Sequence, residues 1–144
     1  KKFDIITHFF VFEHISDPFS FLTQTYDLLK DDGLIICEIP CVNDPLTSIY
    51  NIEAFEKFYW SIAHHYYYSP KSLKYVLDKL KYKYELVPEQ RYDISNHITW
   101  MMDGVPGGQN RFKDFFGIEV AETYRKRLLD TWSCDTIFLY IWKN

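Results

Sequence analysis

The sequence predicts an α/β domain in which strands and helices alternate, and two observations support this fold class. Residues 3–7 and 34–39 are short apolar runs, and an amphipathic helical pattern that begins at Pro18 separates them. A strand, a crossover helix and a second strand form the unit that makes a right-handed parallel connection. The chain also closes on a strand pattern, residues 136–142. We therefore expect a partly parallel sheet with flanking helices.

Local signals delimit the first helix. Ser16 or Asp17 can cap it. Pro18 suits the first helical position, because a backbone N–H at that position has no acceptor within the helix and its absence in proline costs nothing. Apolar residues then recur at helical spacing, and the run Lys-Asp-Asp-Gly at 30–33 predicts the end of the helix before the second strand.

The same signals predict the remaining elements. Residues 41–68 form a long connection, which in a compact domain tends to be functional. Ser69 and Pro70 repeat the arrangement of a cap followed by proline. The further predicted elements are a helix near 52–60, a helix from 70 to 80, a strand over 82–92, an irregular segment over 93–117 and a helix near 118–131.

Bulk composition excludes several classes of protein. A chain of 144 residues with 47% hydrophobic and 25% charged residues is consistent with one globular domain. The formal net charge of −4 argues against a nucleic-acid partner, because phosphate binding needs a basic face. No apolar run approaches the length that spans a bilayer, so no membrane association is expected. The three cysteines are expected to be reduced thiols of a cytoplasmic protein.

The opening segment points to a family. Residues 3–6 read Phe-Asp-Ile-Ile, and residues 13–18 read Glu-His-Ile-Ser-Asp-Pro. This pattern resembles the fourth strand and following turn of class I S-adenosylmethionine-dependent methyltransferases. The resemblance implies a partial Rossmann-like sheet that comprises the family's fourth to seventh strands, with the last strand antiparallel between 34–39 and 82–92. It also implies that residues 1–144 are the carboxyl-terminal part of a methyltransferase domain. The half with the glycine-rich cofactor loop would precede them, so the S-adenosylmethionine site would be incomplete in this chain.

A second motif, His-His-Tyr-Tyr-Tyr-Ser-Pro at 64–70, carries a narrower resemblance. It is similar to a signature of bacterial methyltransferases that act on sugars and related small molecules. The resemblance implies that His64 is the general base or a substrate contact and that Tyr66 contacts the substrate. A histidine is a natural proton acceptor near neutral pH. Ala63 stands where that subfamily often has an acid, and the alternative is that His64 only caps the following turn.

The Glu13-His14 pair is a third candidate. In related methyltransferases this histidine faces the sulfonium of the cofactor and the acceptor, which implies a catalytic role for His14. Some quinone-directed relatives hold a divalent metal with a Glu-x-x-Glu-His group. Phe10 occupies the place of the first glutamate, so we expect no metal. The alternative is that the pair only forms a hydrogen-bonded turn.

Resemblance alone assigns the remaining site residues. His8, Phe9, Phe10 and Glu13 are expected to contact the cofactor. Asn96, His97 and Trp100 belong to an Asn-His-Ile-x-Trp stretch that in polysaccharide-cluster relatives lies near the acceptor. A surface loop without such a role is the alternative for this stretch.

The expected function is methyl transfer to a small polar acceptor, a sugar or nucleotide-sugar, with this chain as an acceptor-side half that has little activity alone. The alternative is a non-catalytic remnant that acts as a dimerisation or interaction module. In either case the strand at 3–7 would lie at an exposed sheet edge, because in the complete fold its other side pairs with the first strand. We therefore expect a homodimer, or pairing with the amino-terminal half, through this strand.

Overall fold

The computed structural model describes all residues, 1–144, and divides them into two compact units. The sheet unit comprises Lys1–Cys41, Ala63–Val87 and Ile137–Asn144, and the helical unit comprises Val42–Ile62 and Pro88–Thr136. None of the helices combines the length and the apolar character needed to cross a membrane.

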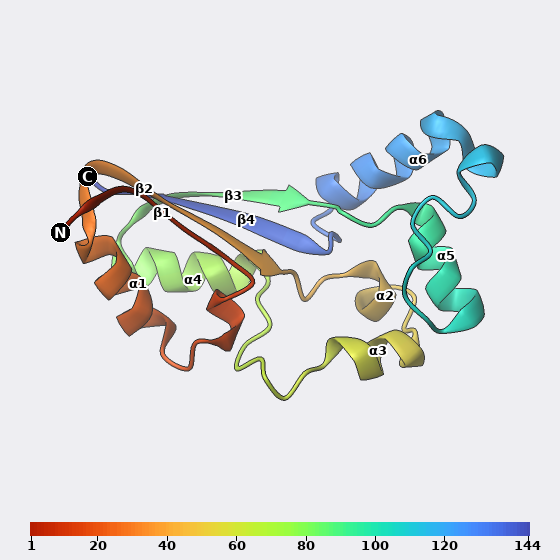
Figure 1. Ribbon diagram of the computed structural model, residues 1–144, viewed down its shortest axis with the longest axis horizontal. Coiled ribbons are helices and arrows are strands. Elements are labelled where there is room, and N and C mark those ends of the chain that lie inside the picture. Colours follow the sequence, from red (N-terminus) through yellow and green to blue (C-terminus); the bar gives the residue numbers. More distant parts are fainter. The chain divides into compact units, whose positions relative to one another are not determined.

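Four strands form one sheet in the order β1-β2-β4-β3 (Figure 1). Strand β1 pairs with β2 in parallel, with Ile5 opposite Leu34 and Phe9 opposite Glu38. Strand β4 lies between β2 and β3 and runs antiparallel to both of them (Figure 1). The predicted parallel pair and the predicted place of the closing strand are confirmed. The strands are β1 (Phe3–Phe9), β2 (Leu29–Pro40), β3 (Lys83–Glu89) and β4 (Thr136–Trp142).

The first crossover differs from its prediction at one end. Helix α1 (Pro18–Asp27) begins at the predicted proline, and the Asp17 side chain accepts a hydrogen bond from the Ser20 backbone N–H at 3.0 Å. The predicted turn at 30–33, however, lies inside β2. Leu29 is fully buried and pairs with Phe3, and the next pair along the ladder is Ile5 with Leu34. Residues 30–33 therefore form a register irregularity within the strand, where Asp32 has a left-handed φ of 63°.

The core of the sheet unit lies on one face of the sheet. Alternate residues of β2 and β4 are fully buried on this face, where α1 and α4 (Pro70–Leu80) cover the sheet (Figure 1). Each such side chain contributes about 1.5–3 kcal/mol when buried. The fully buried residues include Leu22, Ile35, Ile39, Leu73, Leu77, Ile137, Leu139 and Ile141.

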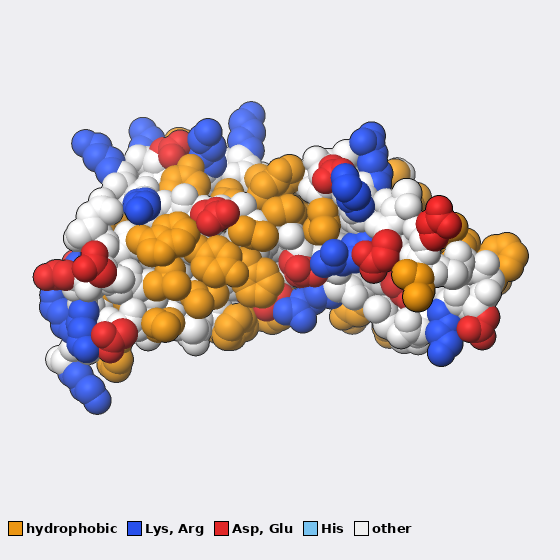
Figure 2. Space-filling view, turned by 90° about the horizontal axis from the view of Figure 1, so that it is seen from above, with side chains coloured by type: hydrophobic (Ala, Val, Ile, Leu, Met, Phe, Trp, Pro, Cys, Tyr) orange, Lys and Arg blue, Asp and Glu red, His pale blue; other side chains and the backbone are white.

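The opposite face of the sheet is apolar and only half-buried. On β4 the rings of Phe138, Tyr140 and Trp142 form a stacked row with centroids 6.2 and 6.3 Å apart. On the edge strand β1, Ile5 is 58% exposed. Figure 2 shows hydrophobic side chains gathered on this side of the sheet unit. Sheets with parallel strands are usually covered on both faces, so this open face is unusual.

The helical unit contains α2 (Pro45–Ser48), α3 (Glu53–Tyr59), α5 (Ile94–Asp103) and α6 (Lys113–Asp130). A small core of Leu46, Phe55 and Trp100 holds it together, and Phe55 and Trp100 meet edge to face at 5.1 Å.

The prediction of an irregular segment over 93–117 is wrong. Residues 94–103 form α5, which the Asp93 side chain caps by accepting a hydrogen bond from the Asn96 N–H at 2.9 Å, and which ends at Gly104 with a left-handed φ of 67°. Helix α6 begins at Lys113 and is interrupted at Gly117, which has non-helical φ and ψ. The part after this kink, 118–130, agrees with the predicted helix near 118–131, and the short helical piece before it was not predicted. Burial of Trp100 explains why a segment with weak local helix signals is helical here.

Candidate active site

A tight turn at the carboxyl end of β1 positions the first two candidate residues. Phe10 has a left-handed φ of 53° and its N–H donates to the Glu38 carbonyl at 2.8 Å, so the chain leaves the sheet sharply. Residues Phe12–His14 then form a single 3₁₀ turn. Because Phe12 is fully buried, it anchors the turn and holds Glu13 and His14 at the carboxyl ends of the parallel strands. Ligands bind at this end of open α/β sheets.

The segment that carries His64 lies against this turn. The backbone N–H groups of His65 and Tyr66 donate to the Glu13 carbonyl at 2.9 and 3.2 Å. The Tyr68 ring stacks on Phe12 with centroids 5.0 Å apart and planes at 12°. These contacts join two segments that are about fifty positions apart in the sequence.

Glu13, His14 and His64 therefore form one cluster, which we call the Glu-His-His cluster. The two imidazole rings meet edge to face with centroids 4.6 Å apart, and the His14 Nε2 atom is 4.0 Å from a Glu13 carboxylate oxygen. The His14 Nδ1 atom is 2.8 Å from the Ala63 carbonyl oxygen. Because a carbonyl oxygen only accepts, Nδ1 must carry a proton, and Nε2 is the ring nitrogen that this hydrogen bond leaves available.

Buried polar atoms without hydrogen-bond partners lie in this cluster, near the end of β1 and on Tyr68. They are both ring nitrogens of His8, Oε2 of Glu13, Nδ1 of His64 and the hydroxyl of Tyr68. All four residues belong to the sheet unit. Buried polar atoms are nearly always paired in folded proteins, and an unpaired one costs about 1–3 kcal/mol. Such a concentration indicates a place where a ligand supplies the missing partners.

Burial sets the charge of these groups. Desolvation lowers the pKa of His8 to about 4, and desolvation together with the nearby His14 lowers the pKa of His64. Desolvation raises the pKa of the Glu13 carboxyl and of the Tyr68 hydroxyl. His8 and His64 are therefore neutral at pH 7, and a neutral imidazole can accept a proton.

A small apolar cavity of about 330 Å³ is lined by residues that closely follow Glu13-His14 and His64 in the sequence. Tyr66 and Tyr68 line it from one side, and the Tyr66 hydroxyl donates to the Ser16 carbonyl at 3.2 Å. Aromatic walls with a few polar groups are typical of small-molecule pockets. The other apolar side chains that line the cavity are Pro18, Phe19, Tyr75 and Val76.

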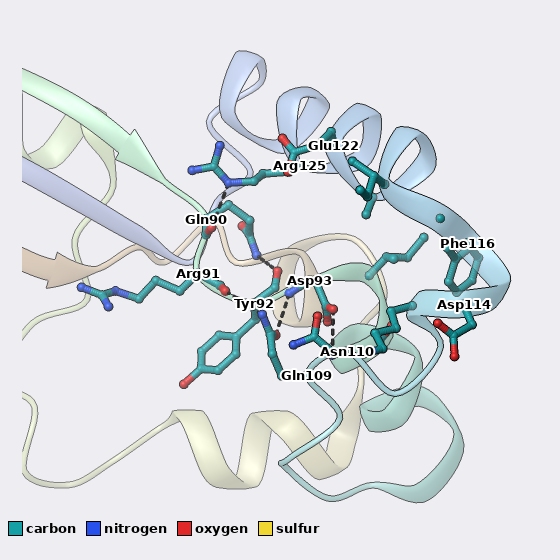
Figure 3. A pocket seen from close by; sticks show the side chains of 16 residues that line it. Gln90, Arg91, Tyr92, Asp93, Gln109, Asn110, Asp114, Phe116, Glu122 and Arg125 are labelled. Atoms are coloured by element: carbon teal, nitrogen blue, oxygen red, sulfur yellow. Dashed lines mark hydrogen bonds between the residues drawn. The ribbon is translucent and has the colours of Figure 1, made fainter.

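The helical unit has a larger cavity of about 600 Å³ between the start of α5 and helix α6 (Figure 3). Its polar groups already bind one another: the Gln90 amide donates to the Tyr92 carbonyl at 2.7 Å, and an Asp93 carboxylate oxygen accepts from the Asn110 N–H at 2.8 Å. None of the unpaired buried atoms lies in this cavity. Its walls therefore offer less for chemistry than the Glu-His-His cluster.

The structure separates the predicted site residues into two groups. His8, Glu13, His14, His64 and Tyr66 lie in the sheet unit around the turn, and Phe9 and Phe10 are exposed at the end of β1. Asn96, His97 and Trp100 lie instead on α5 in the helical unit, where all three are buried.

On α5, the His97 imidazole has a structural partner, because its Nδ1 atom is 2.7 Å from the Tyr124 hydroxyl. The predicted acceptor contact of this stretch stays a prediction. Tyr68 is a site residue that the sequence reasoning missed. The signal was its place in the run Tyr66–Tyr68, but only the stacking on Phe12 distinguishes it from its neighbours.

Comparison with known proteins identifies relatives of the first part of the chain. A family model described as a methyltransferase domain matches residues 1–87. The ubiquinone biosynthesis O-methyltransferase of Ruegeria pomeroyi is 49% identical over 37 residues, and that of Cereibacter sphaeroides is 43% identical over 37 residues. Each alignment covers 26% of this chain and 15% of the relative.

Solved structures match the whole chain. A SAM-dependent methyltransferase from Archaeoglobus fulgidus superposes with a TM-score of 0.52 at 16% identity, over 99% of this chain and 60% of its own. The plantazolicin methyltransferase BpumL, solved with a substrate analogue and SAH, gives a TM-score of 0.56 at 14% identity, over 100% of this chain and 54% of its own. The chain therefore spans little more than half of these structures, and at this identity the likeness establishes the fold.

Proposed function

Because the chain belongs to the methyltransferase domain family, we propose that it transfers a methyl group from S-adenosylmethionine to a small acceptor at the Glu-His-His cluster. The observation that carries this proposal is the concentration of unpaired, buried polar atoms at the carboxyl end of β1. We further propose that residues 1–144 are the acceptor-side half of the domain. Structural neighbours that match nearly all of this chain have additional chain of their own, which supports this division.

The residues at the end of β1 fit one side of a methyl donor. Phe9, Phe10 and Val11 are 49%, 44% and 39% exposed and present an apolar surface to the methionine or adenine part. The unpaired ring nitrogens of His8 and Oε2 of Glu13 offer hydrogen-bond positions at the same end of β1, with His8 on the sheet face opposite to Phe9. When bound, S-adenosylmethionine supplies the electrophilic methyl group.

In this proposal His64 removes the proton from the acceptor. Methyl transfer from a sulfonium is an in-line displacement, so the protein must hold donor and acceptor in line and accept one proton. Burial and the nearby His14 lower the pKa of His64, so the ring is unprotonated at pH 7 and has a free lone pair for the proton. His14, whose ring the Ala63 carbonyl orients, places a second lone pair beside it.

Two classes of acceptor follow from different observations. The motif at 64–70 predicts a sugar or nucleotide-sugar. The cavity lined by Tyr66, Tyr68 and Tyr75 favours a flat, apolar acceptor that carries a hydroxyl group. The O-methyltransferase names of the curated relatives agree with a hydroxyl as the methylated group.

A methyl-transfer assay tests the function. The complete protein is incubated with S-adenosylmethionine labelled in its methyl group and with two panels of acceptors, phenols and nucleotide-sugars. We expect label in one panel only, with phenols favoured by the cavity. Label in the nucleotide-sugars alone would support the motif at 64–70 and reject the aromatic acceptor. No transfer to either panel, together with no S-adenosylmethionine binding, would favour the alternative of a non-catalytic interaction module.

The open sheet edge supports a proposal about assembly. Strand β1 lies at the edge of the sheet and has only β2 as a neighbour, so one row of its backbone groups is available for pairing. Ile5 lies on this strand at the open apolar face of the sheet and is 58% exposed. We propose that the 144-residue chain self-associates through β1 and the adjoining apolar face of the sheet.

Sedimentation velocity tests this assembly. We expect the wild-type chain to form dimers or larger species in a concentration-dependent way, and Ile5→Lys to weaken association by about 10-fold or more because it places a charge in the interface. Ile118→Lys is the matched control, since Ile118 is 84% exposed but lies on α6. A wild-type chain that stays monomeric at high concentration, or equal loss in both variants, contradicts the proposal.

A further inference from the structure

The Glu-His-His cluster has a property that methyl transfer alone does not require. One ligating atom from each of Glu13, His14 and His64 lies within 4.8 Å of the other two. Two of these residues are consecutive in the 3₁₀ turn, and the third comes from the segment that follows α3. A carboxylate and two imidazoles from separate segments thus converge on one point.

We propose that Glu13, His14 and His64 bind one divalent transition-metal ion of the Zn²⁺ class. Three protein ligands of the type His₂Glu, with a further position open, are the ligand set of catalytic zinc sites. Imidazole nitrogen suits Zn²⁺, Co²⁺ and Ni²⁺, whereas Mg²⁺ prefers oxygen ligands. The two histidines therefore favour a transition metal over Mg²⁺.

A hydrogen bond orients the His14 ring so that one of its nitrogens can ligate an ion. The His14 ring donates from Nδ1 to the Ala63 carbonyl at 2.8 Å, which leaves Nε2 as the ligating atom. Metal-bound histidines almost always have such a partner on the other ring nitrogen, because it fixes the orientation of the ring and its tautomer.

The other two residues contribute buried atoms that lack any protein partner. Oε2 of Glu13 and Nδ1 of His64 accept no hydrogen bond, although Glu13 is only 2% exposed. An ion would remove the cost of leaving these atoms unpaired, which is about 1–3 kcal/mol for each buried group. These unpaired buried atoms support the site independently of the spacing of its ligating atoms.

The cluster must contract slightly to hold the ion. Ligand atoms at about 2.0–2.1 Å from a tetrahedral zinc lie about 3.4 Å from one another. In the structure the three ligating atoms lie within 4.8 Å of one another, so they must move closer. The hydrogen bond to Ala63 keeps the His14 ring in place, so small rotations of the partly buried His64 ring and of the Glu13 carboxylate close the difference.

The sequence predicts no metal because Phe10 replaces the first glutamate of a Glu-x-x-Glu-His group. In the structure Phe10 is 44% exposed, and the third ligand of the proposed site is His64 from another segment. The inference goes beyond the proposed function, because the ion can bind whether or not methyl transfer occurs. With the ion bound, His64 would be a ligand and no longer the base. The ion would instead lower the pKa of a coordinated acceptor hydroxyl, whose proton could then leave to water.

Cobalt spectroscopy tests the site without any assay of methyl transfer. The 144-residue chain is treated with a chelator and titrated with Co²⁺, whose visible absorption reports nitrogen and oxygen ligands in a site with fewer than six ligands. We expect saturable absorption at one equivalent, displacement by Zn²⁺ and no displacement by an equal concentration of Mg²⁺. We expect His64→Gln and Glu13→Gln each to weaken Co²⁺ binding by about 100-fold, the upper end of the losses seen when only a supporting residue is removed.

His65→Gln is the matched control, because His65 is the neighbouring histidine and its side chain is exposed. We expect it to bind Co²⁺ as the wild type does, and circular dichroism verifies that each variant is folded. The proposal is overturned if the wild type gives no cobalt absorption, if both glutamine variants keep it, or if His65→Gln loses it equally. Methyl transfer that survives chelation would leave the proposed function intact while this titration decides the metal site.

Discussion

His64→Gln is expected to lower the rate of methyl transfer in the complete protein by about 10²-fold or more, the usual scale for a positioned acid–base group. Glutamine keeps a polar side chain of similar length but cannot accept a proton near neutral pH. His14→Gln is expected to lower the rate as well, because the two rings are in contact with centroids 4.6 Å apart. The measurement is the turnover number with the acceptor identified in the labelled assay.

The control again is His65→Gln, which should keep near-wild-type turnover because its side chain is exposed and lies outside the cluster. The binding constant for S-adenosylmethionine separates a chemical effect from a loss of donor binding. A variant that binds the donor normally but turns over slowly supports the role of His64. Near-wild-type turnover in both His64→Gln and His14→Gln would reject the site assignment while leaving the family membership intact.

Asp44→Asn is expected to stabilise the protein at pH 8 by up to about 4 kcal/mol, because one pH unit of pKa difference corresponds to about 1.4 kcal/mol. Asp44 is 4% exposed in the helical unit, and its side chain accepts a hydrogen bond from the Leu46 N–H at 2.8 Å. Desolvation, with a smaller contribution from Asp135, raises the pKa of Asp44 from 3.8 to about 7. Asparagine keeps the hydrogen bond without the buried charge.

The sign of this pH dependence follows from the raised pKa. The folded state favours protonated Asp44, so its contribution to the free energy of unfolding is fully present below about pH 4 and is lost as the pH rises through about 7. Urea unfolding at pH 4, 6 and 8 should show the variant and the wild type converging at the lowest pH and diverging at the highest. Glu119→Gln, at an exposed position on α6, should show no such divergence. A wild type that gains stability relative to Asp44→Asn between pH 4 and 8 contradicts the prediction.

Much of the sheet unit was predictable because its signals are local. The cap and proline at 17–18 and again at 69–70 mark the starts of α1 and α4, and both helices begin where these residues predict. The closing strand, residues 136–142, has the predicted bounds because its alternate residues face a buried core. Capping hydrogen bonds span three residues and strand alternation has a period of two, so a short window of sequence contains the information.

The helical unit was less predictable because its helices depend on contacts between distant segments. Helix α5 carries Asn96 and Thr99, which have weak helix propensity, yet packing of Trp100 against Phe55 keeps the segment helical. This contact joins positions that are far apart in the sequence, and no local pattern indicates it. The same burial gives His97 a partner in Tyr124 rather than an open position.

The candidate site divides along the same line. Residues 3–18 and 64–70 carry patterns that name Glu13, His14 and His64 as candidates without structural information. Their meeting is a tertiary result, because backbone hydrogen bonds from His65 and Tyr66 to Glu13 bring together segments about fifty residues apart. The local motif, with Phe10 in place of a glutamate, predicts no metal. The fold, however, places His64 beside Glu13 and His14. The sequence therefore determines which side chains are candidates for chemistry. Which of them meet depends on strand order and packing, because these bring together residues that lie too far apart in the sequence for one motif to include.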